Sequence, residues 1–443
     1  MVATARIDSI AAGGAGVSRV DGLVVFTPRT APGDLVELSY VKRDRLGHGR
    51  LTRLLEPSPD RIEPRCRHYD GDRCGGCQLQ HMTVESQREA KRRIVADAFA
   101  RIARRPVDVA AVVPSPGAWG YRNKLTLALR WRDGAWRGGM HRWDDVDRLF
   151  TLEECPITHP RVVAGWRGVL QEGRLLPRAQ ELRGAVRLAG EELAFVLEGG
   201  KQWPHAREFA ALLVGFGAVR WIDAAGREHD ILDRGTPRPA VSFEQVNPAL
   251  AERLHADVVA LVHELVHEVG HERGHERGHE LGHEVVGGVP GITSGSDAAM
   301  VIDAYAGVGD TAVQLTALGL RVEAIELDRE AAEHAARRLA LPSRVHCARV
   351  EDVLPSLLPA EGVIGVILNP PRAGVDARVC ATLEAAARSG AAPRGVVYVS
   401  CNPATLARDV ARLPSYRVAH VQPYDMFPQT AHVETVCLLV PER

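Results

Sequence analysis

The sequence of 443 residues predicts an α/β protein whose C-terminal part folds as a Rossmann-like domain. Three apolar runs support this prediction. Residues 301–304 lead into a glycine turn, residues 322–325 end at Glu326, and residues 363–368 end at Asn369. Short apolar runs that stop at turn or polar residues are typical of strands buried on both faces. Ligands of open α/β sheets bind at the carboxyl ends of such strands, so the residues that follow these runs are candidates for a functional site.

Composition indicates a globular protein of about two or three domains. Hydrophobic residues make up 45% and charged residues 25% of the chain, and the net charge is −1. No apolar stretch reaches the ~18 residues of a membrane span, and the first residues lack the apolar run of a signal peptide. The eight cysteines do not form a secreted disulfide framework, so we expect a reducing cytoplasm.

The N-terminal part, residues 1–57, predicts a small β-barrel. Its apolar stretches are short and divided by turn residues, and 23–27 and 35–41 have the composition of strands. Basic residues outnumber acidic ones between Arg61 and Arg167. This excess fits either a face that contacts phosphates or a solvated helix face, and charge alone leaves both open.

Cysteines mark the next part, residues 58–240. Cys66, Cys74 and Cys77 lie close together around two glycines, and Cys155 follows at a distance. Four thiolates suit zinc or an iron–sulfur cluster, and their spacing does not choose between them. A helical pattern over 84–104 and an alternating pattern over 125–131 follow the first three cysteines.

Cys401 follows the strand-like run Val397–Val399 and precedes the turn Asn402-Pro403. A cysteine with apolar neighbours is commonly a small buried hydrophobe. The turn here puts the thiol at a strand's carboxyl end instead, and a carboxylate, Glu434, follows in the segment 425–435. A thiolate that adds to C6 of a uracil makes C5 nucleophilic, and a carboxylate can then remove the C5 proton.

The glycine turn contains Gly307 and Gly309, and Glu326 follows Gly309 by 17 residues. Glycines allow close backbone approach to a ligand, and an acid at this distance can accept hydrogen bonds from ribose hydroxyls. A nicotinamide site uses the same features. The absence of a third glycine and the later motifs favour S-adenosylmethionine; a plain tight turn is the simpler alternative.

Together these segments resemble the RNA uracil-5-methyltransferase family over nearly the whole chain. The resemblance implies a TRAM-like β-barrel at 1–57, a central iron–sulfur and RNA-binding domain at 58–240, and a class I methyltransferase domain at 241–443. It implies a [4Fe-4S] cluster, S-adenosylmethionine as methyl donor and structured RNA, ribosomal or transfer, as partner; we expect a monomer. The implied site residues are the nucleophile Cys401, the base Glu434, the donor-site residues Gln245, Tyr305, Gly307, Gly309, Glu326 and Asn369, and the cluster ligands Cys66, Cys74, Cys77 and Cys155.

The sequence departs from the family pattern at two places. Seven residues separate Cys66 from Cys74 where the family usually has five, and Asn369 stands where the family has Asp. Asn keeps an acceptor but loses the charge. The residue that contacts adenine stays open between Glu351 and Asp352.

Two other functions stay open. An amine-directed RNA or protein methyltransferase is suggested by the Asn-Pro-Pro that starts at Asn369, and an RNA-binding protein with a degenerate donor site would need no chemistry.

A repeat of His-Glu pairs spans 263–284 and contains overlapping His-Glu-x-x-His frames, which are the zinc-binding signature of metalloproteases. Glycine recurs at 270, 274, 278 and 282, and each glycine weakens a helix by ~1 kcal/mol relative to Ala. We therefore expect a surface-exposed, mobile insertion at about 263–297, not a protease site.

Overall fold

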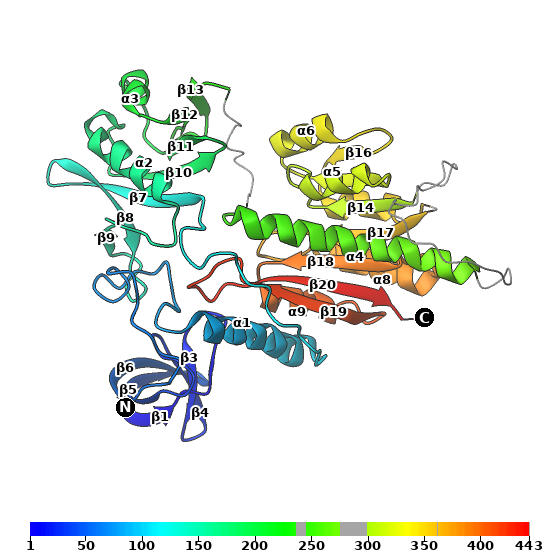
Figure 1. Ribbon diagram of the computed structural model, residues 1–443, viewed down its shortest axis with the longest axis horizontal. Coiled ribbons are helices and arrows are strands. Elements are labelled where there is room, and N and C mark those ends of the chain that lie inside the picture. The colour runs from blue at the N-terminus through cyan, green and yellow to red at the C-terminus, as the bar shows by residue number, and fades with distance from the viewer. Residues whose placement is uncertain (236–244, 275–298, 361, 443) are drawn as a thin grey trace, which may run out of the picture. The chain divides into compact units, whose positions relative to one another are not determined.

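The computed structural model describes the chain except for residues 236–244, 275–298, 361 and 443. The described residues form two compact units, and the chain passes between them more than once. The first unit comprises Met1–Lys91, Pro114–Ala249 and Met426–His432. The second comprises Arg92–Val113, Leu250–Asp425 and Val433–Arg443. Figure 1 traces this path by colour.

The first unit begins with a curved six-stranded sheet in the order β1-β5-β6-β4-β3-β2. Strand β1 also lies against β3, so the sheet curls around a small apolar core that contains Val25, Val36 and Leu38. The sequence pattern explains why one face of the sheet packs on this core, because β5 alternates buried and partly exposed residues over its first six positions. The strands are β1 (Val2–Arg6), β2 (Ser9–Ile10), β3 (Gly16–Val20), β4 (Leu23–Thr27), β5 (Leu35–Arg43) and β6 (Leu46–Glu56). The assignment of this barrel-like sheet as a TRAM domain stays a prediction.

A second sheet of the first unit has the order β13-β12-β11-β10-β7-β8-β9. Its pairs are antiparallel except for β11 with β12. Helices α2 (Pro160–Gln171) and α3 (Ala206–Leu212) cover one face of this sheet, where Trp166, Phe195 and Phe209 pack together. The strands are β7 (Lys124–Arg132), β8 (Ala135–His141), β9 (Leu149–Thr151), β10 (Glu181–Ala189), β11 (Glu192–Glu198), β12 (Phe216–Ile222) and β13 (Glu228–Asp233), and a 3₁₀ turn, η2, spans Gly173–Leu175.

The second unit contains a seven-stranded sheet in the order β16-β15-β14-β17-β18-β20-β19. The ladders between β14, β15, β16, β17 and β18 are parallel, and β20 is antiparallel to both of its neighbours. This confirms the predicted α/β architecture. The strands are β14 (Met300–Ala304), β15 (Arg321–Glu326), β16 (Arg344–Cys347), β17 (Val363–Leu368), β18 (Gly395–Ser400), β19 (Tyr416–Tyr424) and β20 (Glu434–Pro441).

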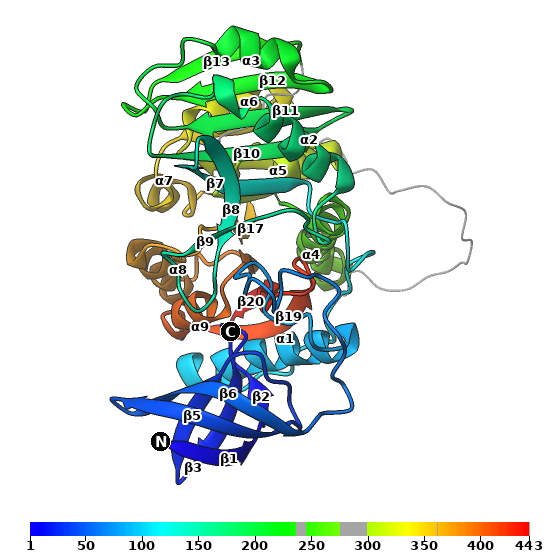
Figure 2. The same ribbon diagram turned by 90° about the vertical axis from the view of Figure 1, so that its left-hand side faces the viewer.

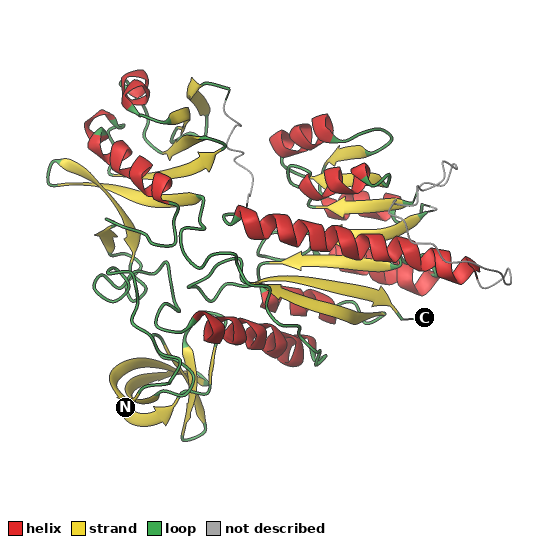
Figure 3. Ribbon diagram, viewed as in Figure 1, coloured by secondary structure: helices red, strands yellow, loops and turns green. Residues whose placement is uncertain are grey.

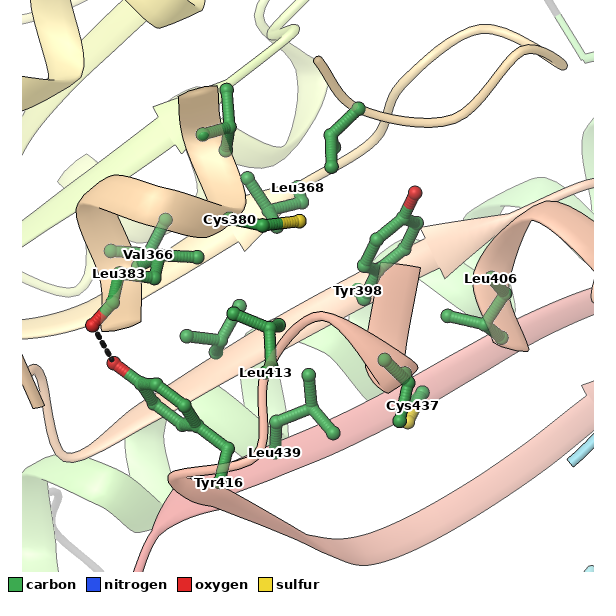
Figure 4. Packing of buried hydrophobic residues seen from close by; sticks show 14 of the residues in the cluster. Val366, Leu368, Cys380, Leu383, Tyr398, Leu406, Leu413, Tyr416, Cys437 and Leu439 are labelled. Atoms are coloured by element: carbon green, nitrogen blue, oxygen red, sulfur yellow. Dashed lines mark hydrogen bonds between the residues drawn. The ribbon is translucent and has the colours of Figure 1, made fainter. Parts of the chain in front are cut away.

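Helices cover both faces of this sheet (Figures 2 and 3). Val366 and Leu368 of β17 point into the large apolar cluster under α7, α8 and α9, whereas a side chain at Gly365 would meet Leu265 of α4 on the opposite face. Figure 4 shows part of this core, with the Tyr416 hydroxyl donating to the carbonyl of Leu383 at 3.2 Å. The helices that follow β14 in the chain are α5 (Asp310–Ala317), α6 (Arg329–Arg338), α7 (Val350–Leu357), α8 (Ala377–Ser389) and α9 (Pro403–Ala411). Helix α1 (Val84–Ala98) and the π-helical turn η1 (Phe99–Ala103) precede them in the chain.

Helix α4 (Pro248–Gly274) includes the first part of the His-Glu repeat. Leu265, which belongs to the repeat, is 4% exposed and packs against Gly395 of β18. The Arg394 guanidinium donates to its carbonyl at 3.4 Å. The expectation of a surface-exposed insertion at 263–297 is therefore wrong for Leu265, because this side chain is buried over Gly365 and Gly395. The rest of the repeat, from 275 on, lies outside the described residues.

Candidate active site

Parallel pairing brings the carboxyl ends of β14, β15, β17 and β18 to one edge of the second sheet. Strand β20 runs in the opposite direction, so it starts at that same edge. The edge therefore gathers five of the predicted site residues, which come from segments far apart in the sequence. These residues are Tyr305, Glu326, Asn369, Cys401 and Glu434.

Cys401 and Glu434 occupy neighbouring positions at this edge. Ser400 pairs with Thr435 in the β18–β20 ladder, so the next residue of each strand toward the edge faces the other. The Cys401 thiol is half-buried, and Glu434 is 2% exposed. Within the described residues, Oε2 of Glu434 has no hydrogen-bond partner. A buried carboxyl oxygen without a partner is costly and commonly marks a functional group.

The electrostatics of the pair follow from this burial. Desolvation raises the pKa of Glu434 to about 8, and the Arg372 guanidinium opposes this rise. Desolvation also raises the pKa of the Cys401 thiol, the Glu434 carboxylate adds to the rise, and Arg372 opposes it. Arg372, which the sequence did not single out as a site residue, is thus the cation that favours the ionised form of both groups.

The local sequence explains why Cys401 stands at the edge. Asn402 caps α9: its side-chain oxygen accepts a hydrogen bond from the backbone N–H of Ala404 at 3.2 Å, and Pro403 is the first residue of the helix. Strand β18 must end before this cap. Cys401 is therefore held in the short turn between a buried strand and a helix N-terminus.

The loop that carries Arg372 is tied to α9. The Asn402 amide and the Thr405 hydroxyl both donate to the Arg372 carbonyl, each at 3.3 Å. The Asp409 carboxylate, which is fully buried, accepts from the backbone N–H of Val375 at 3.0 Å and from the Tyr398 hydroxyl at 2.9 Å. One helix therefore positions both the thiol turn and the arginine loop.

The glycine turn after β14 lies next to Glu326. The backbone N–H of Gly307 donates to Oε2 of Glu326 at 2.8 Å, and that of Asp328 donates to Oε1 at 2.7 Å. Tyr305 has φ 63 and Gly309 has φ 84. A Cβ on Gly309 would stand 2.9 Å from the Cβ of Ala335. Glycine is therefore required at this position both for its positive φ and for the space.

Asp303 of β14 is a buried acid that sequence reasoning did not include in the site. Burial, aided by the charge of Glu326, raises its pKa to about 7, and its Oδ2 has no partner among the described residues. The signal that would have found it is a single acid within an otherwise apolar run, 301–304.

The remaining predicted donor-site residues differ in position. The Asn369 side chain is exposed, and its backbone N–H donates to the Ala304 carbonyl at 3.2 Å. Arg378 contacts both candidates for the adenine contact, Glu351 at 3.1 Å and Asp352 at 2.8 Å. The charge of Glu351 contributes to the raised pKa of Tyr305, so Glu351 is the acid nearer to the glycine turn.

Gln245 belongs to the first unit, just before α4. Its Oε1 is buried and has no hydrogen-bond partner among the described residues. Its assignment to the donor site stays a prediction.

The four predicted metal-ligand cysteines line one cavity of about 70 Å³ in the first unit. All four are free thiols, and burial raises the pKa of Cys66 to about 11 and that of Cys77 to about 12. The backbone N–H of Gly76 donates to the sulfur of Cys74 at 3.4 Å, and the Thr158 hydroxyl donates to that of Cys155 at 3.1 Å. Across the described ranges, no group of three or more His, Cys, Asp or Glu side chains is arranged to hold a metal ion.

Comparisons with known proteins decide the family. An uncharacterised RNA methyltransferase of Thermosynechococcus vestitus is 32% identical, and the match covers 98% of this chain and 97% of the relative. A second, from Gloeobacter violaceus, is 31% identical over 98% of this chain and 96% of its own. The family model for tRNA (uracil-5-)-methyltransferase matches residues 311–442. The chain belongs to the RNA uracil-5-methyltransferase family.

The fold of this family member is also found in a solved structure. The tRNA (uracil-54, C5)-methyltransferase of Pyrococcus abyssi, in complex with S-adenosyl-L-homocysteine, matches with a TM-score of 0.65 and 23% identity. The match covers 99% of this chain and 100% of that chain. At this identity the likeness shows the fold, and the chemistry must be argued from the site.

The part of the methyltransferase that the family model matches, residues 311–442, includes Glu326, Asn369, Cys401 and Glu434. Among all the residues that the structure describes, no helix is long and apolar enough to cross a membrane. The expected cytoplasmic location and monomeric state stay predictions.

Proposed function

We propose that this protein transfers a methyl group from S-adenosylmethionine to C5 of a uridine in structured RNA, ribosomal or transfer. The observation that carries the proposal is the pair at the edge of the second sheet, where a half-buried Cys401 lies beside a buried Glu434 whose Oε2 has no partner in the described part of the chain. A nucleophile beside a base is the arrangement that covalent catalysis requires.

The chemistry uses each group once. The Cys401 thiol first loses its proton to water, and the thiolate then adds to C6 of the uracil, which forms a C6–S bond and moves the electrons of the double bond to C5 and O4. C5 then attacks the methyl group, and the methyl–sulfonium bond of the donor breaks. Glu434 takes the proton from C5, the C5–C6 double bond forms again, and the C6–S bond breaks. A carboxyl with a pKa of about 8 is well matched to accept this proton near neutral pH.

Arg372 supports the first and last steps. Burial and the Glu434 carboxylate raise the pKa of the Cys401 thiol and so oppose its ionisation. The guanidinium of Arg372 lowers the free energy of the thiolate and of the Glu434 carboxylate. It therefore prepares the nucleophile and the base together.

The donor fits the opposite part of the same edge. Both oxygens of Glu326 already accept one backbone N–H each, and each has a further lone pair for a ribose hydroxyl. Asp303 supplies an additional carboxyl oxygen without a partner among the described residues. Tyr305, Gly307 and Gly309 belong to the turn next to these acids. We keep Asn369 and Gln245 as further donor-site residues on the resemblance alone.

The first unit holds the four thiols that an iron–sulfur cluster would need as ligands. Four free thiols line one cavity there, and N–H and O–H donors point at two of the sulfurs, as they do at thiolate ligands. We propose that Cys66, Cys74, Cys77 and Cys155 hold a [4Fe-4S] cluster. When bound, it would join the loop of the first three cysteines to the Cys155 segment. Zinc is the alternative for this donor set.

Amine methylation is the second candidate, and the exposed Asn369 at the site edge is the observation that favours it. Amine methylation gives no role to Cys401 or Glu434.

The two functions differ in the product, so the decisive test is to incubate the protein with labelled S-adenosylmethionine and uridine-containing RNA and to identify the labelled nucleoside. We expect 5-methyluridine, with none from Cys401→Ser and normal amounts from the control Cys347→Ser, which replaces an exposed cysteine. Label on an exocyclic amine, or an active Cys401→Ser, would contradict the proposal.

A further inference from the structure

Residues 426–432 lie between β19 and β20 and belong to the first unit, where several of their backbone groups accept or donate hydrogen bonds. The carbonyl of Met426 accepts from the Asn247 amide at 3.3 Å, and that of Phe427 accepts from the Lys91 ammonium at 2.9 Å. The carbonyl of Pro428 accepts from the Tyr121 hydroxyl at 3.0 Å. This is an unusual density of partners for a loop, since loops normally leave such groups to water.

Gln87 holds the centre of this segment. Its Oε1 accepts from the backbone N–H of Gln429 at 2.9 Å, and its Nε2 donates to Oε1 of Gln429 at 3.0 Å. Gln87 is fully buried and Gln429 is 2% exposed. Gln429 has φ 70, a conformation that costs a residue other than glycine ~1 kcal/mol or more. The two side-chain contacts offset this cost and select one backbone conformation.

The cysteine loop holds the same residue from the other side. The backbone N–H groups of Gln78 and Leu79, which directly follow Cys77, donate to the Gln429 carbonyl at 3.1 and 3.0 Å. The Gln78 side chain donates to the Gly75 carbonyl at 2.9 Å and accepts from the backbone N–H of Ala431 at 3.4 Å.

The barrel-like sheet in turn fixes this cysteine loop. Arg29 donates to the carbonyls of Cys74 at 2.9 Å and Cys77 at 3.2 Å, and its guanidinium lies 3.3 Å from the centre of the Tyr69 ring. The Tyr69 hydroxyl donates to the Gln78 carbonyl at 2.7 Å. A continuous set of contacts therefore runs from the sheet through the cysteine loop to Gln429.

We infer that Gln78, Gln87 and Gln429, which we call the glutamine clasp, position Glu434 for removal of the C5 proton and make that step depend on the cysteine loop. Glu434 follows Gln429 by five residues in the chain, so the clasped segment leads directly into the start of β20. The inference rests on the proposed function, because it assigns a task to Glu434. The three glutamines touch no reacting atom and act as positioning residues.

If the glutamine clasp positions Glu434, removal of the C5 proton should be more sensitive to loss of the clasp than the other chemical steps are. Thiol addition to C6 and attack of C5 on the methyl group need Cys401 and the donor, whereas breaking the C5–H bond needs the carboxylate at one position. A loosened clasp should therefore slow proton removal and leave the two earlier steps intact. A base displaced by a fraction of an ångström loses about tenfold or more in rate.

The test compares Gln87→Ala with the control Gln171→Ala, which replaces an exposed glutamine at the end of α2. Release of tritium from RNA labelled at C5 of uridine measures proton removal in a single turnover. Adduct formation with 5-fluorouridine RNA measures the earlier steps, because fluorine at C5 cannot leave as a proton. We expect Gln87→Ala to release tritium about tenfold more slowly, to accumulate a methylated adduct on uridine RNA, and to form the 5-fluorouridine adduct as fast as Gln171→Ala.

Gln429→Gly provides a second variant that keeps the positive φ without strain and removes the side chain. The same selective loss is expected. Cys77→Ser should show it as well, together with loss of visible absorbance, and this readout does not depend on activity. Equal slowing of both reactions, or no change in either, would overturn the inference. Failure of the parent protein to form any 5-fluorouridine adduct would instead overturn the proposed function.

Discussion

At the scale of single residues, burial decides what the site can do. Cys401 and Glu434 were predictable from the sequence, because each lies beside a recognisable turn or strand end. Their pKa values were not, since these depend on desolvation and on Arg372, which only the folded chain brings near. Asp303 was missed although a single acid in an apolar run marked it; that its Oδ2 lacks a partner among the described residues is visible only in the folded chain.

Replacing Arg372 should shift the pH dependence of methylation. Arg372→Ala removes the cation that lowers the pKa of Cys401 and of Glu434, so both pKa values should rise. Methylation requires the ionised forms, and its rise with pH should therefore move to higher pH. The rate measured across neutral and alkaline pH tests this, with Arg417→Ala, an exposed arginine of β19, as control. An unshifted profile would remove Arg372 from the site.

Glu434→Gln should stabilise the protein as pH rises. The pKa of Glu434 is raised from 4.5 to about 8 in the folded state. Stability from the bound proton is present below the unfolded pKa and is lost as pH rises through the folded one, because ionisation leaves a buried charge. Glutamine cannot ionise, so the variant should melt at a temperature similar to that of the parent near pH 4.5 and higher near pH 8. Parallel melting temperatures across this range would contradict the buried-acid assignment.

At the scale of elements, the turns and the helix caps carry the site. The strand ends and the α9 cap were readable as apolar runs and an Asn-Pro pair, because these signals are local. The extent of α4 could not be predicted from the sequence, because the recurring glycines of the repeat argue against a helix. In the folded chain Leu265 packs over two glycines of the sheet. Tertiary packing overrode local propensity here.

Gly374→Ala tests the connection between the arginine loop and α9. A Cβ at Gly374 would stand 2.3 Å from Oδ2 of Asp409, and the residue has φ 82. Gly390→Ala is a matched control with φ 77 and open space around the added carbon. We expect the control to lose ~1 kcal/mol of unfolding free energy from backbone strain, and Gly374→Ala to lose more and to methylate RNA more slowly. Equal losses in denaturant titrations would show that the contact with Asp409 has no role.

Leu265→Ala tests the assignment of the start of the repeat to the core. Removing this buried side chain should cost ~2–5 kcal/mol of unfolding free energy, as in other apolar cores. Leu318→Ala, at a position 40% exposed, serves as control and should change little. A neutral Leu265→Ala would restore the view that the whole repeat is a surface insertion.

At the scale of the whole molecule, the chain places the four cysteines of the predicted cluster and the reactive pair in different compact units. The order of these parts along the sequence was predictable, because each has its own motif. The return of residues 426–432 to the first unit was not, since its partners, Gln78 and Gln87, lie more than 300 positions away in the sequence.

The cluster proposal predicts a measurable metal content. Anaerobically purified protein should contain about four irons per chain and absorb visible light, and Cys74→Ser should lose both together with part of its thermal stability. Cys347→Ser, with an exposed thiol, should keep both. One zinc per colourless chain would leave a metal site and remove the cluster.

The central claim is that Cys401 forms a covalent bond with C6 of a uridine during methylation, and trapping that bond tests it most directly. The protein is incubated with S-adenosylmethionine and 5-fluorouridine RNA, digested, and analysed by mass spectrometry. We expect one modified peptide, in which Cys401 carries a methylated 5-fluorouridine nucleotide. An unmodified Cys401 in a preparation that methylates uridine RNA, or an adduct on another residue, would contradict it.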